Sequence, residues 1–86
     1  MRRDLNKVRH LLTLIEACPD HMGIHRERLA DKWIESGTTA NPLGWDEYSY
    51  LLDRSLEAGL ISIRTGSVLL TWEGHDWLDR NRTMNF

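Results

Sequence analysis

The segment LTWEGHDWLD, residues 70–79, decides the fold because it marks the change from a strand to a helix. Thr71 is placed to cap that helix, with its hydroxyl accepting the amide of Gly74. Glu73 follows in the first turn, where a negative charge complements the helix dipole. Gly74 lowers helix propensity, which indicates that another backbone or a ring approaches it. The segment therefore predicts a short final helix over WEGHDWLDRNR, residues 72–82, that packs closely on what precedes it.

A β-hairpin is predicted directly before this helix. In LISIRTGSVLLT, residues 60–71, Ile61 and Ile63 alternate with polar side chains. The stretch Thr65-Gly66-Ser67 supplies turn residues, and an apolar return strand runs over residues 68–70. This pattern is typical of two short antiparallel strands.

Three amphipathic helices are predicted upstream, over residues 4–17, 23–36 and 45–59, because apolar residues recur there at three- and four-residue steps. Asp4 is placed to cap the first helix, and Gly59 ends the third where a left-handed backbone is needed. The side chains expected to face the core are Leu5, Val8, Leu11, Leu12 and Ile15, then Ile24, Leu29, Ala30, Trp33 and Ile34, then Tyr48, Leu51, Leu52, Ser55 and Leu56, and finally Leu78 with Trp72 or Trp77.

Three helices, a hairpin and a short C-terminal helix follow one another in the order of a winged helix, an α+β variant of the helix-turn-helix architecture. The join LEAGLISI, in which the third helix ends at a glycine and the chain enters the hairpin at once, supports this order. A chain of 86 residues has room for one small core. We therefore expect a single winged-helix domain over residues 1–86.

Three stretches of the chain also resemble a known family. MRRDLNKVRHLLTLIE, YSYLLDRSLEAGLI and LTWEGHDWLD resemble, in that order, a domain-of-unknown-function family of small winged-helix-like proteins of bacteria and their prophages. The resemblance implies a winged-helix fold and an origin in a phage or prophage. It implies no activity, because the family offers no catalytic or binding residues to carry over.

Composition narrows the classes of function. Eleven Lys and Arg oppose thirteen Asp and Glu, so the chain has a formal net charge of -2 and lacks the basic excess of most nucleic-acid binders. Its single cysteine, Cys18, allows no intramolecular disulfide, and no long apolar run offers a signal peptide or membrane span. The sequence predicts a cytoplasmic protein without membrane contact, as a monomer or homodimer.

The predicted third helix is acidic on its outward side, where a winged helix would meet DNA. Acidic and aromatic side chains together suit a basic protein surface better than a polyanion. We therefore expect a non-enzymatic protein that binds a host protein, such as a nucleic-acid-processing enzyme, as a host-defence inhibitor of the anti-CRISPR kind would. The residues predicted to bind it are Asp46, Glu47, Tyr50, Asp53, Arg54 and Glu57.

DNA binding is the alternative function, because the predicted first helix carries a basic cluster. Such a protein would act as a transcriptional regulator and dock through that helix and the hairpin, where cations neutralise phosphates. The candidate residues are Arg2, Arg3, Lys7, Arg9, Arg26, Arg28 and Arg64. A solvated helix face is the simpler explanation for most of these charges.

Metal binding and catalysis are weaker hypotheses. Cys18, His21 and His25 form C-x2-H-x3-H, which has zinc-binding chemistry but lacks an evident fourth ligand. Glu73, His75 and Asp76 have acid and base chemistry, but neighbouring positions at a helix start point in different directions. We expect His75 to bond a helix end or a loop carbonyl. The sequence therefore predicts no enzyme and no cofactor.

Overall fold

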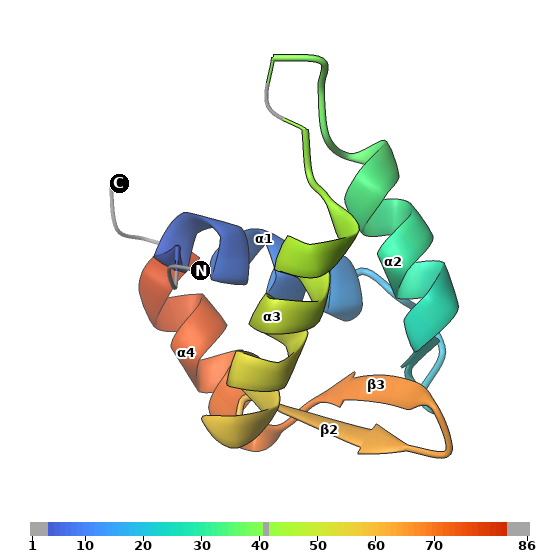
Figure 1. Cartoon of the computed structure of the whole chain (residues 1–86). Coiled ribbons are helices and arrows are strands. Elements are labelled where there is room, and N and C mark those ends of the chain that lie inside the picture. Colours follow the sequence, from blue (N-terminus) through green and yellow to red (C-terminus); the bar gives the residue numbers. More distant parts are fainter. Residues whose placement is uncertain (1–3, 41, 83–86) are drawn as a thin grey trace.

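The computed structural model describes residues 4–40 and 42–82. This part of the chain contains four helices and a three-stranded antiparallel sheet, so the predicted α+β class is confirmed. The elements are α1 (Leu5–Glu16), β1 (Ile24–His25), α2 (Arg26–Glu35), α3 (Trp45–Glu57), β2 (Ile61–Arg64), β3 (Ser67–Leu70) and α4 (Trp72–Arg82). In Figure 1, α2 and α4 flank α3, and the hairpin of β2 and β3 lies at the foot of α3.

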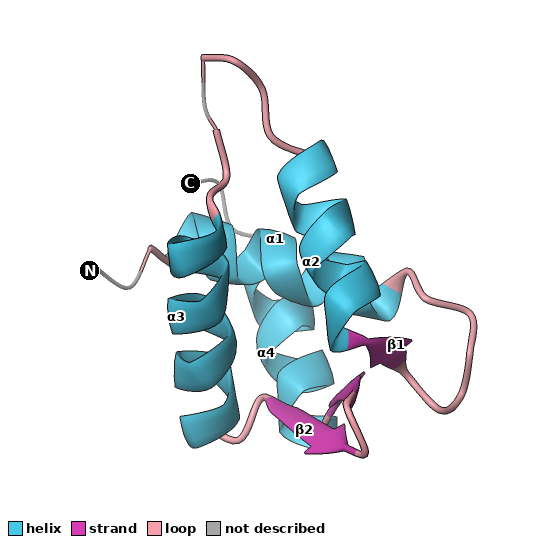
Figure 2. Ribbon diagram, turned by 45° about the vertical axis from the view of Figure 1, so that its right-hand side comes forward, coloured by secondary structure: helices cyan, strands magenta, loops and turns pink. Residues whose placement is uncertain are grey.

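The sheet has the order β1-β3-β2, so the hairpin is joined on its β3 side by a strand from much earlier in the chain. Ile24 pairs with Val68 in β3, and Ile63 of β2 pairs with the same Val68 from the other side. Strand β1, which Figure 2 shows at the start of α2, was not predicted from the sequence. Two residues are too few for a visible alternation, and α2 is correspondingly shorter than the predicted 23–36.

The hairpin turn is tighter than predicted. Thr65 and Gly66 both have left-handed backbones, with φ of 48° and 84°, and Arg64 pairs directly with Ser67. This is the two-residue geometry whose twist matches that of the flanking strands. Ser67 therefore lies in β3 and not in the turn.

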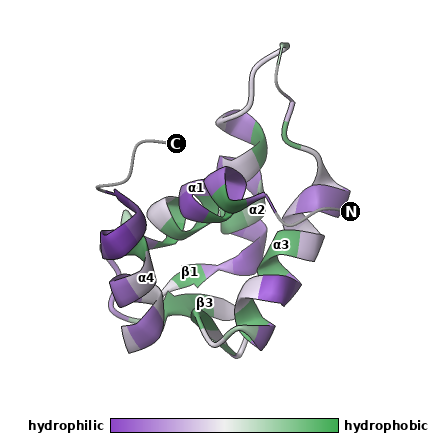
Figure 3. Ribbon diagram, turned by 90° about the vertical axis from the view of Figure 1, so that its left-hand side faces the viewer, coloured by the Kyte–Doolittle hydropathy of each residue, from purple (hydrophilic) through white to green (hydrophobic). Residues whose placement is uncertain are grey.

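The core lies where the inner faces of the helices meet the sheet. It is formed by Val8, Leu11, Leu12, Ile15, Ile24, Leu29, Ala30, Trp33, Leu43, Tyr48, Leu51, Leu52, Ile61, Val68 and Leu78, and Ser55 is buried beside it. Figure 3 shows this separation of hydrophobic and hydrophilic residues along the ribbons. Leu5, Ile34 and Leu56, which were predicted to face inward, are exposed. Each continues an apolar stripe at its edge, beyond the reach of a neighbouring element.

Helix α1 begins as predicted, because the Asp4 carboxylate accepts the amides of Asn6 and Lys7 at 3.0 and 3.3 Å. None of the helices within residues 4–40 and 42–82 is both long and apolar enough to cross a membrane.

Helix α4 packs on α1 through buried Leu78, and half-buried Trp77 also contacts the core. Of the two predicted tryptophans, Trp72 is the one that does not pack, with 86% of its surface exposed.

The corner between the hairpin and α4 confirms the prediction made from residues 70–79. The Thr71 hydroxyl accepts the amide of Gly74 at 2.9 Å and donates to the carbonyl of Gly59. The Thr71 amide donates to the carbonyl of Leu60 at 3.0 Å. Gly74 lies directly against that Leu60 carbonyl, where a Cβ atom would come within 2.0 Å of the oxygen. The glycine therefore allows α4 to pack against the junction of α3 and β2.

We predict that Gly74→Ala destabilises the protein although alanine is the better helix former. A methyl group at this position must displace the Leu60 backbone, and overpacking of this kind costs about 1–3 kcal/mol. Urea unfolding followed by circular dichroism measures the free energy of unfolding. The control is Gly44→Ser, which adds atoms at a helix N-cap with nothing within 4 Å and should lose no stability. Equal stability of Gly74→Ala and wild type would contradict the close approach.

Candidate functional site

The outward surface of α3 carries carboxylates as predicted. We call Asp46, Asp53 and Glu57 the acidic face, since all three are exposed and follow one side of the helix. Asp46 and Asp53 make no ion pair within the part of the chain that the structure describes. Beside them Trp45 is 57% exposed, and its ring lies 5.5 Å from the ring of buried Tyr48. Two free carboxylates of the acidic face, those of Asp46 and Asp53, therefore lie beside a large aromatic side chain.

Glu47, which was also predicted to bind the partner, is paired with a lysine of the same chain. Both of its carboxylate oxygens lie 2.9 Å from Nζ of Lys7 on α1, and both side chains are partly buried. Sequence reasoning assigned Glu47 to protein binding and Lys7 to DNA binding. Because α1 and α3 pack side by side, the two charges instead neutralise each other and join the helices.

Tyr50 and Arg54 are also more constrained than predicted. Tyr50 is half-buried and packs against the core. The Arg54 guanidinium lies 5.6 Å from the centre of the Tyr50 ring, and its Nη2 donates to Oε1 of Glu57 at 2.8 Å. Such a stacked and paired arginine is held in place but remains partly exposed. Within the acidic face, the carboxylates of Asp46 and Asp53 are thus unpaired, and that of Glu57 is paired with Arg54.

Two of the predicted DNA-binding residues lie next to the hairpin turn. The amide of Arg26, at the start of α2, donates to the carbonyl of Gly66 in the turn at 2.9 Å, and Arg64 ends the adjacent strand. We call Arg26, Arg28 and Arg64 the wing cluster. These arginines are exposed and have no ion-pair partner among the described residues. The pairing of β1 with β3, which the sequence did not reveal, brings α2 to the hairpin.

The other basic candidates do not join this cluster. Arg9 lies on α1 with Lys7, whereas Arg2 and Arg3 lie outside the described residues. Lys32 was not among the predicted basic residues, yet it lines the same groove as Arg28 beside α2. The spacing of four residues between Arg28 and Lys32 was a signal for a shared helix face.

The candidate zinc ligands, Cys18, His21 and His25, do not assemble. His25 caps α2, with its Nδ1 accepting the amide of Glu27 at 3.3 Å, and His21 lies 3.9 Å from the Asp20 carboxylate. Cys18 is half-buried against the core. No group of three His, Cys, Asp or Glu side chains within residues 4–40 and 42–82 is arranged to hold a metal ion. The C-x2-H-x3-H residues span a loop, a strand and a helix cap, so their side chains make different local contacts.

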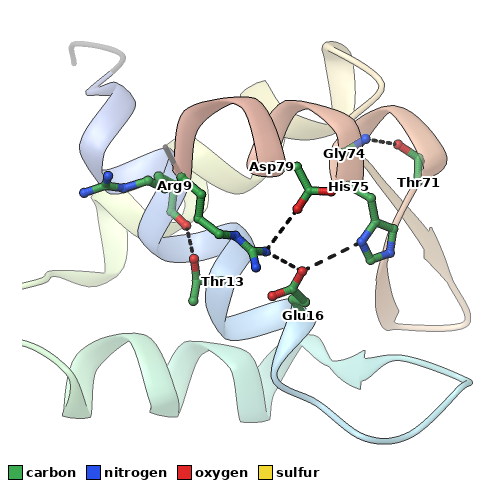
Figure 4. A network of polar contacts seen from close by, with 8 residues as sticks. Arg9, Thr13, Glu16, Thr71, Gly74, His75 and Asp79 are labelled. Carbon is green, nitrogen blue, oxygen red and sulfur yellow. Dashed lines mark hydrogen bonds and ion pairs between the residues drawn. The ribbon is translucent and has the colours of Figure 1, made fainter. Parts of the chain in front are cut away.

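The acid and base residues of α4 are likewise separated. His75 turns toward α1, where its Nδ1 lies 4.0 Å from a Glu16 oxygen that also accepts from Arg82 (Figure 4). Arg82 is 3.7 Å from Asp79 as well, and its hydrogen bond to Glu16 raises the pKa of the guanidinium. Glu73 and Asp76 line a different groove, toward α3. His75 thus lies next to the end of α1, one of the two predicted environments, but its neighbour there is the carboxylate of Glu16.

His10 is the histidine that is most constrained by packing. Its Nε2 lies 2.7 Å from Oγ of Ser36, and its ring is 5.5 Å from that of buried Trp33. Desolvation by this burial lowers the pKa of His10 below its ordinary value of 6.5. The folded protein therefore favours the neutral imidazole of His10.

We predict that His10 makes the protein less stable in acid. Because its pKa is lower in the folded state, its contribution is fully present above about pH 6.5 and is lost as the pH falls through the folded-state value. Urea unfolding at pH 7.5 and pH 5.5 measures the loss in free energy of unfolding. The loss should be smaller in His10→Gln than in the control His21→Gln, whose histidine is exposed. Identical pH profiles for the two variants would contradict this assignment.

The chain was compared with protein-family models, with curated proteins and with solved structures. None of these comparisons gives a match. The arrangement of the described side chains is therefore the basis for assigning a function.

Proposed function

We propose that the chain is a winged-helix domain that acts, without catalysis, by binding a protein through the acidic face of α3. The winged-helix assignment is supported by the element order, in which a short strand precedes the second helix and a hairpin follows the third. The sheet order β1-β3-β2 also supports it, because that early strand pairs with the return strand of the hairpin. In such a domain α3 is the recognition helix and β2–β3 the wing.

The choice of a protein partner is carried by one observation, the exposed and unpaired carboxylates of Asp46 and Asp53 on α3. A recognition helix that enters the major groove must approach phosphates, which these carboxylates repel. Opposite charges at an interface instead speed association and exclude wrong partners. The exposed ring of Trp45 adds apolar area of the kind that often dominates binding energy.

The partner we propose is a host protein with a basic, solvent-exposed surface, such as the nucleic-acid site of an enzyme. A small acidic domain on such a site excludes the nucleic acid by occupying its cations, as a host-defence inhibitor would. The proposal follows from charge complementarity and needs no catalytic group. It is consistent with the separation of His75 from Glu73 and Asp76 on α4.

We predict that Asp46→Lys/Asp53→Lys weakens partner binding by more than about tenfold, because like charges then face each other across the interface. The partner is isolated by affinity capture from a lysate of the encoding organism and then titrated as a purified protein. The matched control is Asp31→Lys on α2, an exposed aspartate outside the acidic face. Equal loss in the control, or unchanged affinity in the double variant, would overturn the role of the acidic face.

The wing cluster favours DNA binding as a second candidate function. Arg26, Arg28 and Arg64 are exposed near the hairpin turn, where the wing of a winged helix follows the DNA backbone. Cations placed there bind phosphates without reading base edges. This docking leaves α3 outside the major groove, which avoids the conflict with Asp46 and Asp53.

If the wing cluster binds DNA, wild-type protein shifts a random 20-base-pair duplex at low salt. Each arginine removed should then lower the slope of log affinity against log salt by about 0.9, since each phosphate contact releases counterions. Arg26→Gln/Arg64→Gln tests this, and Arg80→Gln on α4 controls for the loss of positive charge. Absence of a shift by the wild-type protein, or the same slope in the double variant, would eliminate DNA binding through the wing.

A further inference from the structure

A groove runs beside α2 on a part of the molecule that includes no residue of α3. It lies between α2 and the connection from α1 to β1, residues 17–23, which Figure 2 shows as the loop next to β1. Its volume is about 660 Å³, within the range of small-molecule sites, and it is partly open to solvent. We call it the α2 groove. Its lining includes no residue of the acidic face and none of the residues that pair α1 with α4.

One part of the α2 groove is apolar. Leu14 and Ile24 reach it from the core side, and Met22 lies on the connecting loop with 63% of its surface exposed. An unbranched methionine adapts its shape to a bound molecule at little energetic cost. Such a wall suits a flat or extended apolar body.

The other part of the groove is cationic. Arg28 and Lys32 are one turn apart on the same side of α2, and neither has an ion-pair partner among the described residues. Ser67 of β3 and His25 of β1 line the groove next to the first turn of α2. Ser67 offers a hydroxyl donor, so this end provides both charge and hydrogen bonds for an anion.

Two carboxylates also line the α2 groove and determine where an anion can lie. Asp20 is on the loop, where its carboxylate accepts the Met22 amide at 2.9 Å and lies 3.9 Å from His21. Glu35 is at the opposite end of α2, seven residues from Arg28, which is about 10.5 Å along a helix. Repulsion by Glu35 therefore directs an anionic group to the Arg28 end.

We propose that the α2 groove binds a small amphipathic molecule that has one anionic group and an apolar body. The anionic group pairs with Arg28 beside Ser67 and His25, and the apolar body lies along Leu14, Met22 and Ile24. Lys32 contributes a second positive charge along the wall. This site shares no residue with the acidic face on α3, so it can be tested separately from the proposed protein binding.

The test uses 8-anilinonaphthalene-1-sulfonate, an aromatic sulfonate, and its uncharged counterpart N-phenyl-1-naphthylamine, both titrated by fluorescence. We expect the sulfonate to bind with one-to-one stoichiometry. Arg28→Gln should weaken the sulfonate about tenfold, because it removes a charge-assisted hydrogen bond, and leave the neutral probe unaffected. Ala17→Trp, which fills the groove, should weaken both probes.

The matched control is Arg64→Gln, which removes the same charge from the hairpin outside the groove and should change neither affinity. Amide chemical shifts on addition of the sulfonate should move in residues 17–25 and 28–36. Unfolding of each variant in urea confirms that it is folded. Equal sulfonate affinity in wild type and Arg28→Gln, or amide shifts confined to the exposed tryptophans of α3 and α4, would overturn the proposal.

Discussion

The contact between Gly74 and the Leu60 carbonyl is the constraint on which the rest of the structure depends. It allows the first turn of α4 to approach the junction of α3 and β2 without a Cβ atom between them. Thr71 fixes the same corner from both sides, by capping α4 and by bonding the carbonyl of Gly59. With α4 fixed in this position, Leu78 completes the core against α1. The hairpin, the last helix and the first helix therefore form one packed unit.

The packing of α3 separates a buried inner side from a charged outer side. Its inner side carries Tyr48, Leu51 and Leu52, and burial there brings the Tyr48 hydroxyl within 2.7 Å of the Arg26 carbonyl. Its outer side is left with the carboxylates of the acidic face. One edge is neutralised, because Lys7 of α1 reaches Glu47. The result is that, among the described residues, the unpaired carboxylates of α3 are those of Asp46 and Asp53.

Local sequence patterns predicted the helices and the hairpin, because the interactions that begin and end these elements are local. The Asp4 cap, the left-handed Gly59 and the cap of α4 by Thr71 each involve residues within a few positions of one another. Leu5, Ile34 and Leu56 were assigned wrongly to the core. Periodicity identifies the apolar stripe of a helix but not the width of the neighbour that covers it. Strand β1 escaped prediction because two residues show no pattern until β3 pairs with them.

For the candidate sites, the sequence predicted only which charged residues each element carries. The sequence by itself determined that α3 is acidic on its outer side, that another backbone or a ring approaches Gly74, and that three helices, a hairpin and a final helix follow one another in this order. Only the tertiary structure decided that Glu47 pairs with Lys7, that the candidate zinc ligands do not come together, and that the Arg26 amide bonds the hairpin turn that follows Arg64. The physical reason is that residue type and spacing set what one element can present. Which charges remain unpaired depends on side chains brought from distant parts of the chain.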